Sequence, residues 1–301
     1  MSEQRVDVDE MVEIPTRVLV ESMIRDDATI DASELYMVAG ALGMSDQQVR
    51  LQIKRLANEG LIIQEGRGRR ALLRVGGELV DSIGPNVEFV RFMYDQDRGA
   101  APWNGVWHLV GFAVPEARRH DRDAVRDGIV SLGGAAVQGG LYVSPNSWEP
   151  YIDTLASRLD IAGYLTRLTT TDLRVGNLES PRDIAAQLWP LDKIAAGHQR
   201  LRTVAQTRLD RLTDPHELSP SEMLTVLVEL AAEFTRASEP DPLLPPELLP
   251  QPWPGTQARA VLAACWTQLM HRETLLHAWP RMFHSYADVI RQVSAVGDSP
   301  D

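Results

Sequence analysis

The side chains best suited to recognising another molecule are concentrated in one short stretch, residues 45–74. Seven basic residues and only three acidic ones occur there, although the whole chain carries a formal net charge of −12. The seven basic residues are Arg50, Lys54, Arg55, Arg67, Arg69, Arg70 and Arg74. Because guanidinium and ammonium groups bind phosphate, and arginine also contacts guanine edges, a local cationic island favours a nucleic-acid partner despite the acidic total.

An amphipathic helix is predicted to carry the first part of this island. Ser45 suits the N-cap position, and Gln48 follows at the spacing of a capping box. Val49, Ile53 and Leu56 recur on one face at helical spacing. The opposite face presents side chains of the types that reach base edges and phosphates, together with one leucine: Gln47, Gln48, Arg50, Leu51, Lys54 and Arg55.

The elements around this helix complete a recognisable pattern. Two shorter helices are expected before it, over residues 15–24 and from a cap at Ser33 to Gly43, with a short strand through Ile30 between them. After it, residues 61–63 and 71–75 predict two strands joined by a basic turn. Helix, turn, helix and then a basic hairpin is the order of a winged helix-turn-helix. The expected DNA contacts are Ser45, Gln47, Gln48, Arg50, Lys54, Arg55, Arg67, Arg69 and Arg70.

Two alternatives remain open for this region. The helix could be an ordinary amphipathic helix and the arginines a solvated loop, or the winged helix could serve only protein contacts. The order of the features within thirty residues favours DNA binding.

The middle of the chain changes to a strand-rich pattern. Residues 79–97 predict a connector interrupted at Gly84-Pro85. Strands are then expected over 106–114, 135–143 and within 163–175, separated by helices that begin at Pro115 and near Trp148. The order β-α-β-α-β predicts a small ferredoxin-like α+β sandwich.

The last third of the chain predicts helices. Ser180-Pro181 opens one of them, and further helices are expected over 191–212, 221–236, 256–270 and 272–296. Between the third and fourth of these five, residues 239–255 contain seven prolines and must be extended. This segment is either a linker or a strap whose leucines and Trp253 pack against the domain.

Signatures of catalysis are missing from the sequence. No pair among the seven histidines has metal-binding helical spacing, and Cys265 is the single cysteine, so we expect no zinc site and no other metal. Phosphate-binding and nucleophile-elbow motifs are also missing. The N-terminus does not resemble a signal peptide, and no apolar run is long enough for a membrane span. We therefore expect a cytoplasmic protein without catalytic residues or cofactors.

Three longer motifs carry a family resemblance. They are MSDQQVRLQIKRLANEGLI, GVWHLVGFAVPEARRHDRDAVRDGIVSLGGAAVQGGLYVSP and DPLLPPELLPQPWPG. With them the chain resembles the PaaX family of bacterial repressors of aromatic-acid catabolism along nearly its whole length. The resemblance implies a winged helix at 1–80, a connector at 81–100, a Cas2-like ferredoxin-like domain at 101–178 and an all-α domain at 179–301. It also implies an effector, phenylacetyl-coenzyme A or another catabolic intermediate.

The likeness to Cas2 does not imply cleavage of nucleic acid. A metal-dependent nuclease of that kind needs a carboxylate at the end of its first strand, where this chain has Ala113-Val114-Pro115. Glu116 falls in the following helix. Fold likeness alone carries no activity.

Together these features predict a homodimeric repressor whose two DNA-reading helices enter successive major grooves of an inverted repeat. An acyl-coenzyme A effector needs cations for its phosphates and an apolar pocket for its acyl end. Candidates of these types are Trp107, Arg118, Arg119, Arg122 and Trp253; the alternative is that the arginines are solvated and the tryptophans belong to the core. A nuclease or other enzyme with an appended winged helix, and an activator, are the alternative functions.

Overall fold

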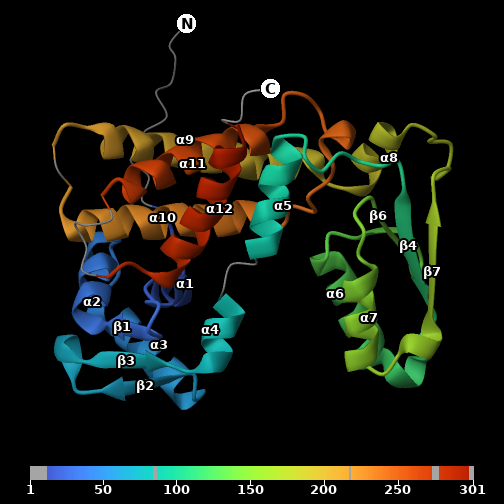
Figure 1. The fold of residues 1–301 in the computed structure, drawn as a ribbon. Helices are drawn as coiled ribbons and strands as arrows, with labels where there is room; N and C mark the ends of the chain where they lie inside the picture. Colours follow the sequence, from blue (N-terminus) through green and yellow to red (C-terminus); the bar gives the residue numbers. More distant parts are fainter. Residues whose placement is uncertain (1–11, 84–86, 217, 273–277, 298–301) are drawn as a thin grey trace, which may run out of the picture. The chain divides into compact units, whose positions relative to one another are not determined.

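The computed structural model describes residues 12–83, 87–216, 218–272 and 278–297 (Figure 1). The chain forms two compact units. The first consists of residues 1–94, 197–237 and 254–301, and the second of residues 95–196 and 238–253. The four-part division expected from the sequence stays a prediction.

The first unit begins with short helices and a three-stranded antiparallel sheet. The strand order is β1-β3-β2, and Ile30 of β1 pairs with Leu73 of β3. The elements, in chain order, are α1 (Thr16–Ser22), β1 (Thr29–Asp31), α2 (Ala32–Ala41), α3 (Asp46–Asn58), β2 (Ile62–Glu65), β3 (Leu72–Val75), α4 (Gly77–Ile83) and α5 (Val87–Asp97).

Two details of this region differ from the expectation. The N-cap of α2 is Asp31 rather than Ser33, because the Asp31 carboxylate accepts hydrogen bonds from the backbone N–H groups of Ser33 (2.8 Å) and Glu34 (3.1 Å). The expected connector at 79–97 is largely helical, in α4 and α5. The expected break at Gly84-Pro85 lies outside the described residues.

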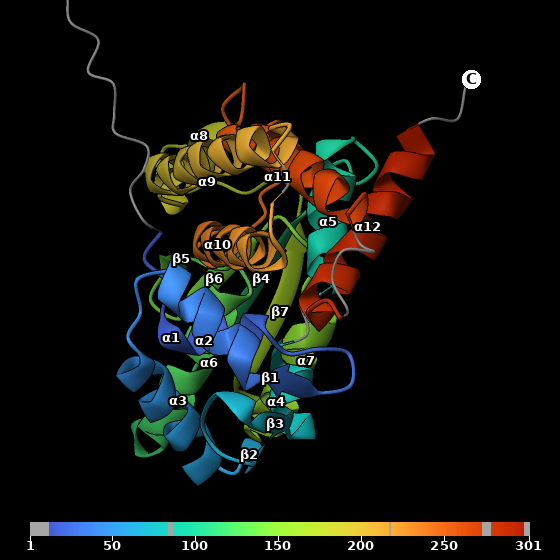
Figure 2. The same ribbon diagram turned by 90° about the vertical axis from the view of Figure 1, so that its left-hand side faces the viewer.

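Four longer helices follow in the sequence, and most of their length belongs to the first unit. They are α9 (Leu191–Thr213), α10 (Pro220–Ser238), α11 (Pro254–Met270) and α12 (Arg281–Gly297). Figures 1 and 2 place α10 between α9 and the pair α1 and α2. Leu224, Val228 and Ala232 of α10 are buried in the same core as the side chains of α1, α2 and α3.

The last helix is shorter than expected. A helix over 272–296 was predicted, but α12 starts only at Arg281, and Trp279 and Pro280 precede it outside any helix. Pro280 has no N–H to continue a helix, and it forms a β-bridge with Arg25 instead. Residues 273–277 lie outside the described residues.

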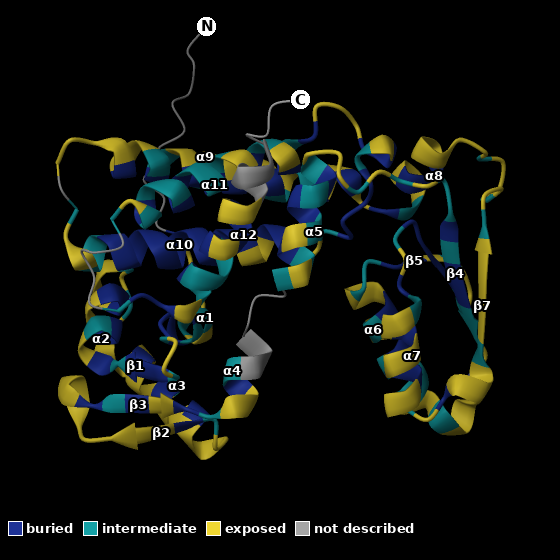
Figure 3. Ribbon diagram, viewed as in Figure 1, coloured by how far each residue is buried: buried dark blue, intermediate teal, exposed yellow. Residues whose placement is uncertain are grey.

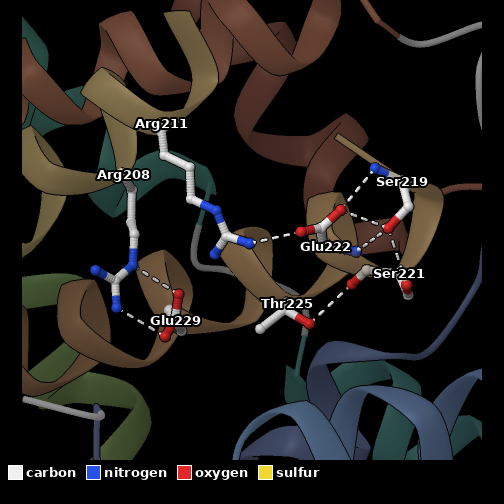
Figure 4. A network of polar contacts seen from close by, with 7 residues as sticks. All are labelled: Arg208, Arg211, Ser219, Ser221, Glu222, Thr225 and Glu229. Carbon is white, nitrogen blue, oxygen red and sulfur yellow. Dashed lines mark hydrogen bonds and ion pairs between the residues drawn. The ribbon is translucent and has the colours of Figure 1, made fainter. Parts of the chain in front are cut away.

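Polar contacts join α9 to α10 (Figure 4). Arg208 donates two hydrogen bonds to Glu229, at 2.7 and 2.8 Å, and both residues are buried. Arg211 bonds Glu222 at 2.9 Å, and Glu222 also accepts a hydrogen bond from the Ser219 hydroxyl at the start of α10. Removal of either partner would leave the other as a buried charge without its partner, which is strongly destabilising.

The second unit contains a four-stranded antiparallel sheet. Its strands are β4 (Trp107–Phe112), β5 (Ala135–Gln138), β6 (Leu141–Ser144) and β7 (Leu165–Thr170), in the order β5-β6-β4-β7. With α6 (Arg119–Ser131) and α7 (Glu149–Arg158) the chain order is β-α-β-β-α-β, the split βαβ arrangement. The mixed helix-and-sheet class expected from the sequence is confirmed.

The single strand predicted over 135–143 is wrong. Residues 135–144 form a hairpin of β5 and β6 that turns at Gly139-Gly140. Gly140 has a φ of 75°, and a Cβ there would lie 2.8 Å from the Phe112 carbonyl oxygen, so a side chain does not fit. Apolar residues on both sides of Gly139-Gly140 predicted one continuous strand, so the turn was not predicted.

Each face of this sheet is covered by different elements. Val110 and Tyr142 pack with Val125 of α6 and Ile152 of α7 on one face. On the other face a second cluster is formed by Trp107, Leu109, Val143, Ile184, Trp189, Leu244, Leu248, Leu249 and Trp253. It includes side chains of α8 (Pro181–Leu188) and of the proline-rich segment.

The proline-rich segment is a packed strap rather than a linker. Leu243, Leu244, Leu248 and Leu249 are buried. The Leu243 carbonyl accepts hydrogen bonds from the side-chain amides of Asn146 (2.8 Å) and Gln96 (3.0 Å).

Among the described residues, no helix is both long enough and apolar enough to cross a membrane.

Candidate nucleic-acid interface

Helix α3 is built as its sequence predicts. The Ser45 hydroxyl accepts a hydrogen bond from the Gln48 N–H at 3.3 Å, and the Gln48 side chain accepts one from the Ser45 N–H at 2.8 Å. These two bonds form the predicted capping box. Val49, Ile53 and Leu56 are buried in the core of the first unit.

The other side of α3 is open. All of the predicted contact residues on the helix are exposed: Ser45, Gln47, Gln48, Arg50, Lys54 and Arg55. Ser45 and Gln48 already use their side chains to cap the helix. Gln47, Arg50, Lys54 and Arg55 therefore remain as the outward polar side chains of this set.

The hairpin after α3 presents a second cationic surface. Residues 63–70 are all exposed, as the colour of β2 and the turn beyond it in Figure 3 illustrates. We call residues 66–70 the wing turn. Gly66 and Gly68 have φ values of 89° and 61°, a backbone conformation that favours glycine. Arg67, Arg69 and Arg70 lie in this turn, close in sequence to its glycines.

Ion pairs divide the seven cations of residues 45–74 into two groups. Three of them bind the three carboxylates of the same stretch: Arg55 to Glu59 at 3.0 Å, Arg69 to Asp46 at 3.1 Å, and Arg74 to Glu65 at 2.6 Å. No hydrogen bond or ion pair to a described residue occupies the side chains of the other four, Arg50, Lys54, Arg67 and Arg70. The local excess of positive charge thus resides on two side chains of α3 and two of the wing turn.

One of these ion pairs links the helix to the wing turn. Arg69 donates hydrogen bonds to both carboxylate oxygens of Asp46, at 3.1 and 3.2 Å, and its guanidinium lies 5.7 Å from the centre of the Tyr36 ring. Asp46 is the first residue of α3, so the pair fixes the wing turn against the N-terminus of that helix. The sequence did not predict this role of Asp46, because no local pattern indicates a contact between residues 23 positions apart.

The candidate effector residues do not form one site. Trp107 and Trp253 are buried in the cluster on the strap side of the sheet. Trp107 stacks on Trp189, with ring centroids 6.4 Å apart. Arg119 and Arg122 belong to α6 and Arg118 immediately precedes it, and α6 packs on the opposite face of the sheet.

Each candidate arginine already has a polar partner. Arg118 bonds the carboxylate of Asp121 at 2.7 Å, and Arg122 bonds Glu116 at 2.6 Å. Arg119 lies 3.8 Å from Asp123. The role of these five residues in effector binding stays a prediction, and the structure does not bring them together in one site.

Other reactive groups of the described residues are held in structural positions. Burial raises the pKa of the Cys265 thiol to about 12, and its sulfur contacts the carbonyl of Ala205. Nδ1 of His108 lies 2.5 Å from a carboxylate oxygen of Glu149, a contact that the sequence did not suggest. No group of three or more possible metal ligands occurs among the residues that the structure describes.

The chain is a mixed helix-and-sheet protein with a Cas2-like central domain. Residues 100–185 match the PaaX protein central Cas2-like domain, and residues 189–284 match the PaaX-like protein C-terminal domain. The chain belongs to the PaaX family. This membership is consistent with a transcriptional regulator of phenylacetic acid catabolism.

A solved structure supports the fold. The uncharacterized protein Rv0674 from Mycobacterium tuberculosis is similar over 87% of this chain and 98% of its own, with a TM-score of 0.52 and 22% sequence identity. At this identity the likeness concerns the fold alone. No curated protein matches the chain.

Proposed function

We propose that this protein is a transcription repressor that binds duplex operator DNA through a winged helix-turn-helix. The motif consists of α1, α2 and α3 with the sheet β1-β3-β2. The observation that carries the proposal is a group of four cations on α3 and the wing turn that have no carboxylate partner among the described residues, in a chain of net charge −12. Family membership supports the regulatory role.

In this proposal α3 enters the major groove with its outward side chains toward the bases. The groove is about 12 Å wide and admits one helix. Arg50 is suited to guanine, whose O6 and N7 accept two hydrogen bonds from one guanidinium, and Gln47 is suited to adenine. Lys54 is suited to a backbone phosphate as a single compact charge.

The wing turn contacts the DNA beside that groove. Arg67 and Arg70 are exposed, and Arg67 lies between Gly66 and Gly68, which both have positive φ values. Each can bind a phosphate or enter a narrow minor groove, where the negative potential is strongest. Arg69 contributes less to this contact, because Asp46 already holds it.

We propose that the repressor is a homodimer in the cytoplasm that binds an inverted repeat, so that two copies of α3 occupy major grooves about one helical turn apart. Release from DNA requires a ligand that binds better to a state in which the two copies no longer match this spacing. The family suggests an aromatic acyl-coenzyme A, such as phenylacetyl-coenzyme A, as that ligand.

We propose no enzymatic activity for the Cas2-like sheet. After β4 the chain continues through Ala113-Val114-Pro115, so no carboxylate follows the strand directly. Glu116 comes next and is paired with Arg122. The family is one of regulators rather than enzymes.

A gel-shift experiment with the DNA upstream of the protein's own gene tests the proposal. The wild-type chain should retard this duplex, and one compound from a panel of acyl-coenzyme A thioesters and free aromatic acids should abolish the shift. Arg50→Ala should weaken binding by about 1–3 kcal/mol if Arg50 makes a bidentate base contact. Failure to retard this duplex, or its cleavage on addition of Mg²⁺, would overturn the proposed function.

A further inference from the structure

Helix α3 carries one outward side chain that charge does not explain, Leu51. It is 59% exposed, among the most exposed large apolar side chains in the described part of the chain. Successive residues of a helix are about 100° apart, which places Leu51 opposite the buried row of Val49, Ile53 and Leu56. The same spacing aligns it with Gln47 and Lys54, so it lies at the centre of the outward face.

The surroundings of Leu51 restrict what can cover it. Arg50 is its neighbour in the chain and Lys54 follows one turn later, and no described residue is paired with either cation. An apolar protein surface placed over Leu51 would bury these charges without partners, at a large cost in free energy. The suitable occupant is anionic around its edge and presents a small apolar group at its centre.

A DNA major groove meets both conditions. Phosphates line its two sides, and thymine is the only standard base that presents a methyl group there. The other atoms at the base edges are hydrogen-bond donors and acceptors, which a leucine side chain cannot satisfy. Charge complementarity around Leu51 therefore favours duplex DNA over a second copy of the chain.

We propose that Leu51 is a specificity-determining residue that packs on the 5-methyl group of a thymine in each half of the operator. This inference rests on the proposed function, because it assumes that α3 enters the major groove. Water leaves the leucine and the thymine methyl when they meet, so the contact stabilises only complexes with thymine at that position.

Deoxyuridine substitution isolates this contact, since deoxyuridine pairs with adenine as thymine does and lacks only the methyl group. The probe is a duplex that the wild-type chain enriches from a randomised pool. Each thymine in it is then replaced singly by deoxyuridine, and affinity is measured by fluorescence anisotropy. We expect one position per half-site at which wild-type binding weakens about fourfold, the effect of about 0.8 kcal/mol for one buried methyl-sized group.

The Leu51→Ala variant completes a double-mutant cycle. It should bind the unmodified duplex more weakly than the wild type, and the sensitive thymine should become indistinguishable from deoxyuridine. Because Leu51 is exposed, the variant should unfold at the wild-type denaturant midpoint. Met37→Ala is the matched control: Met37 is also exposed (46%) but lies on α2, so this variant should keep the wild-type loss at the sensitive position.

Three results would overturn the inference. They are an enriched duplex without a sensitive thymine, an equal deoxyuridine effect in Leu51→Ala, and a change in oligomeric state of Leu51→Ala by sedimentation with DNA affinity unaltered. Failure of the pool to yield any enriched duplex would instead contradict the proposed function itself.

Discussion

At the scale of single residues, charge pairing decides which cations can contribute to DNA binding. A cation already bound to a carboxylate displaces fewer counterions from DNA than one without a partner. Arg55, Arg69 and Arg74 are held by Glu59, Asp46 and Glu65, whereas Arg50, Lys54, Arg67 and Arg70 are exposed and without such partners among the described residues. Residue counts predict the cationic island, but only the ion pairs seen in the structure divide its cations into these two groups.

In the second unit, the Glu149 carboxylate makes the free energy of unfolding depend on pH. Burial alone would raise the pKa of the Glu149 carboxyl, but hydrogen bonds from His108 and from the Ser147 hydroxyl outweigh burial and lower it. A carboxyl whose pKa is lowered by folding stabilises the protein above its unfolded pKa, and this stabilisation is lost as the pH falls through the folded value.

We therefore predict that Glu149→Gln unfolds at a lower denaturant concentration than the wild type at about pH 7, and that the two midpoints converge as the pH falls through the lowered pKa of the folded Glu149 carboxyl. Urea unfolding curves at a series of pH values measure this. Glu116→Gln, at an exposed residue, is the control and should change the midpoint little. A constant difference between Glu149→Gln and the wild type at all pH values would contradict the assignment.

At the scale of elements, the link between α3 and the wing turn matters most. The Asp46–Arg69 pair fixes two surfaces that the sequence predicts separately. We predict that Asp46→Asn frees Arg69, so that the negative slope of log affinity against log salt concentration becomes steeper by about 0.9 for one added phosphate contact. Binding to random-sequence duplex should strengthen, and the preference for the enriched duplex should fall.

Anisotropy titrations at several salt concentrations measure these slopes. Asp127→Asn is a control with the same change of charge, because Asp127 pairs with Arg126 on α6 of the second unit. An unaltered slope in Asp46→Asn would show that Arg69 makes no added DNA contact after its release.

Local signals explain which elements the sequence predicts well. The capping box of Ser45 and Gln48 and the buried row of α3 are both encoded within thirteen residues, and both are confirmed. The hairpin at Gly139-Gly140 was missed, because β5 and β6 together show the apolar content of one longer strand. The late start of α12 was missed, because the helix-breaking Pro280, which forms a β-bridge with Arg25, was not weighed against the apolar spacing around it.

At the scale of the whole molecule, residues from both ends of the chain meet in the first unit. The Arg281 N–H donates to the Ile24 carbonyl at 2.7 Å, and His284 lies 2.6 Å from Asp26. Leu224 and Val228 of α10 share one core with the N-terminal helices. No local sequence pattern predicts such distant contacts.

A salt titration of DNA binding tests the proposed surface by removing the four cations that have no ion-pair partner among the described residues. Wild type is compared with a variant in which Arg50, Lys54, Arg67 and Arg70 are alanine. The control variant removes four cations of the second unit, Arg126, Arg158, Arg167 and Arg174. Each variant loses four positive charges, so the change of total charge is identical. Both are titrated against the duplex that the wild type enriches.

We predict that the first variant binds on the order of 100-fold more weakly and that its negative salt slope becomes shallower by about 3, while the control resembles the wild type. Equal losses in the two variants would mean that only total charge matters. Unchanged binding by the first variant would contradict the central claim that α3 and the wing turn form the DNA-binding surface.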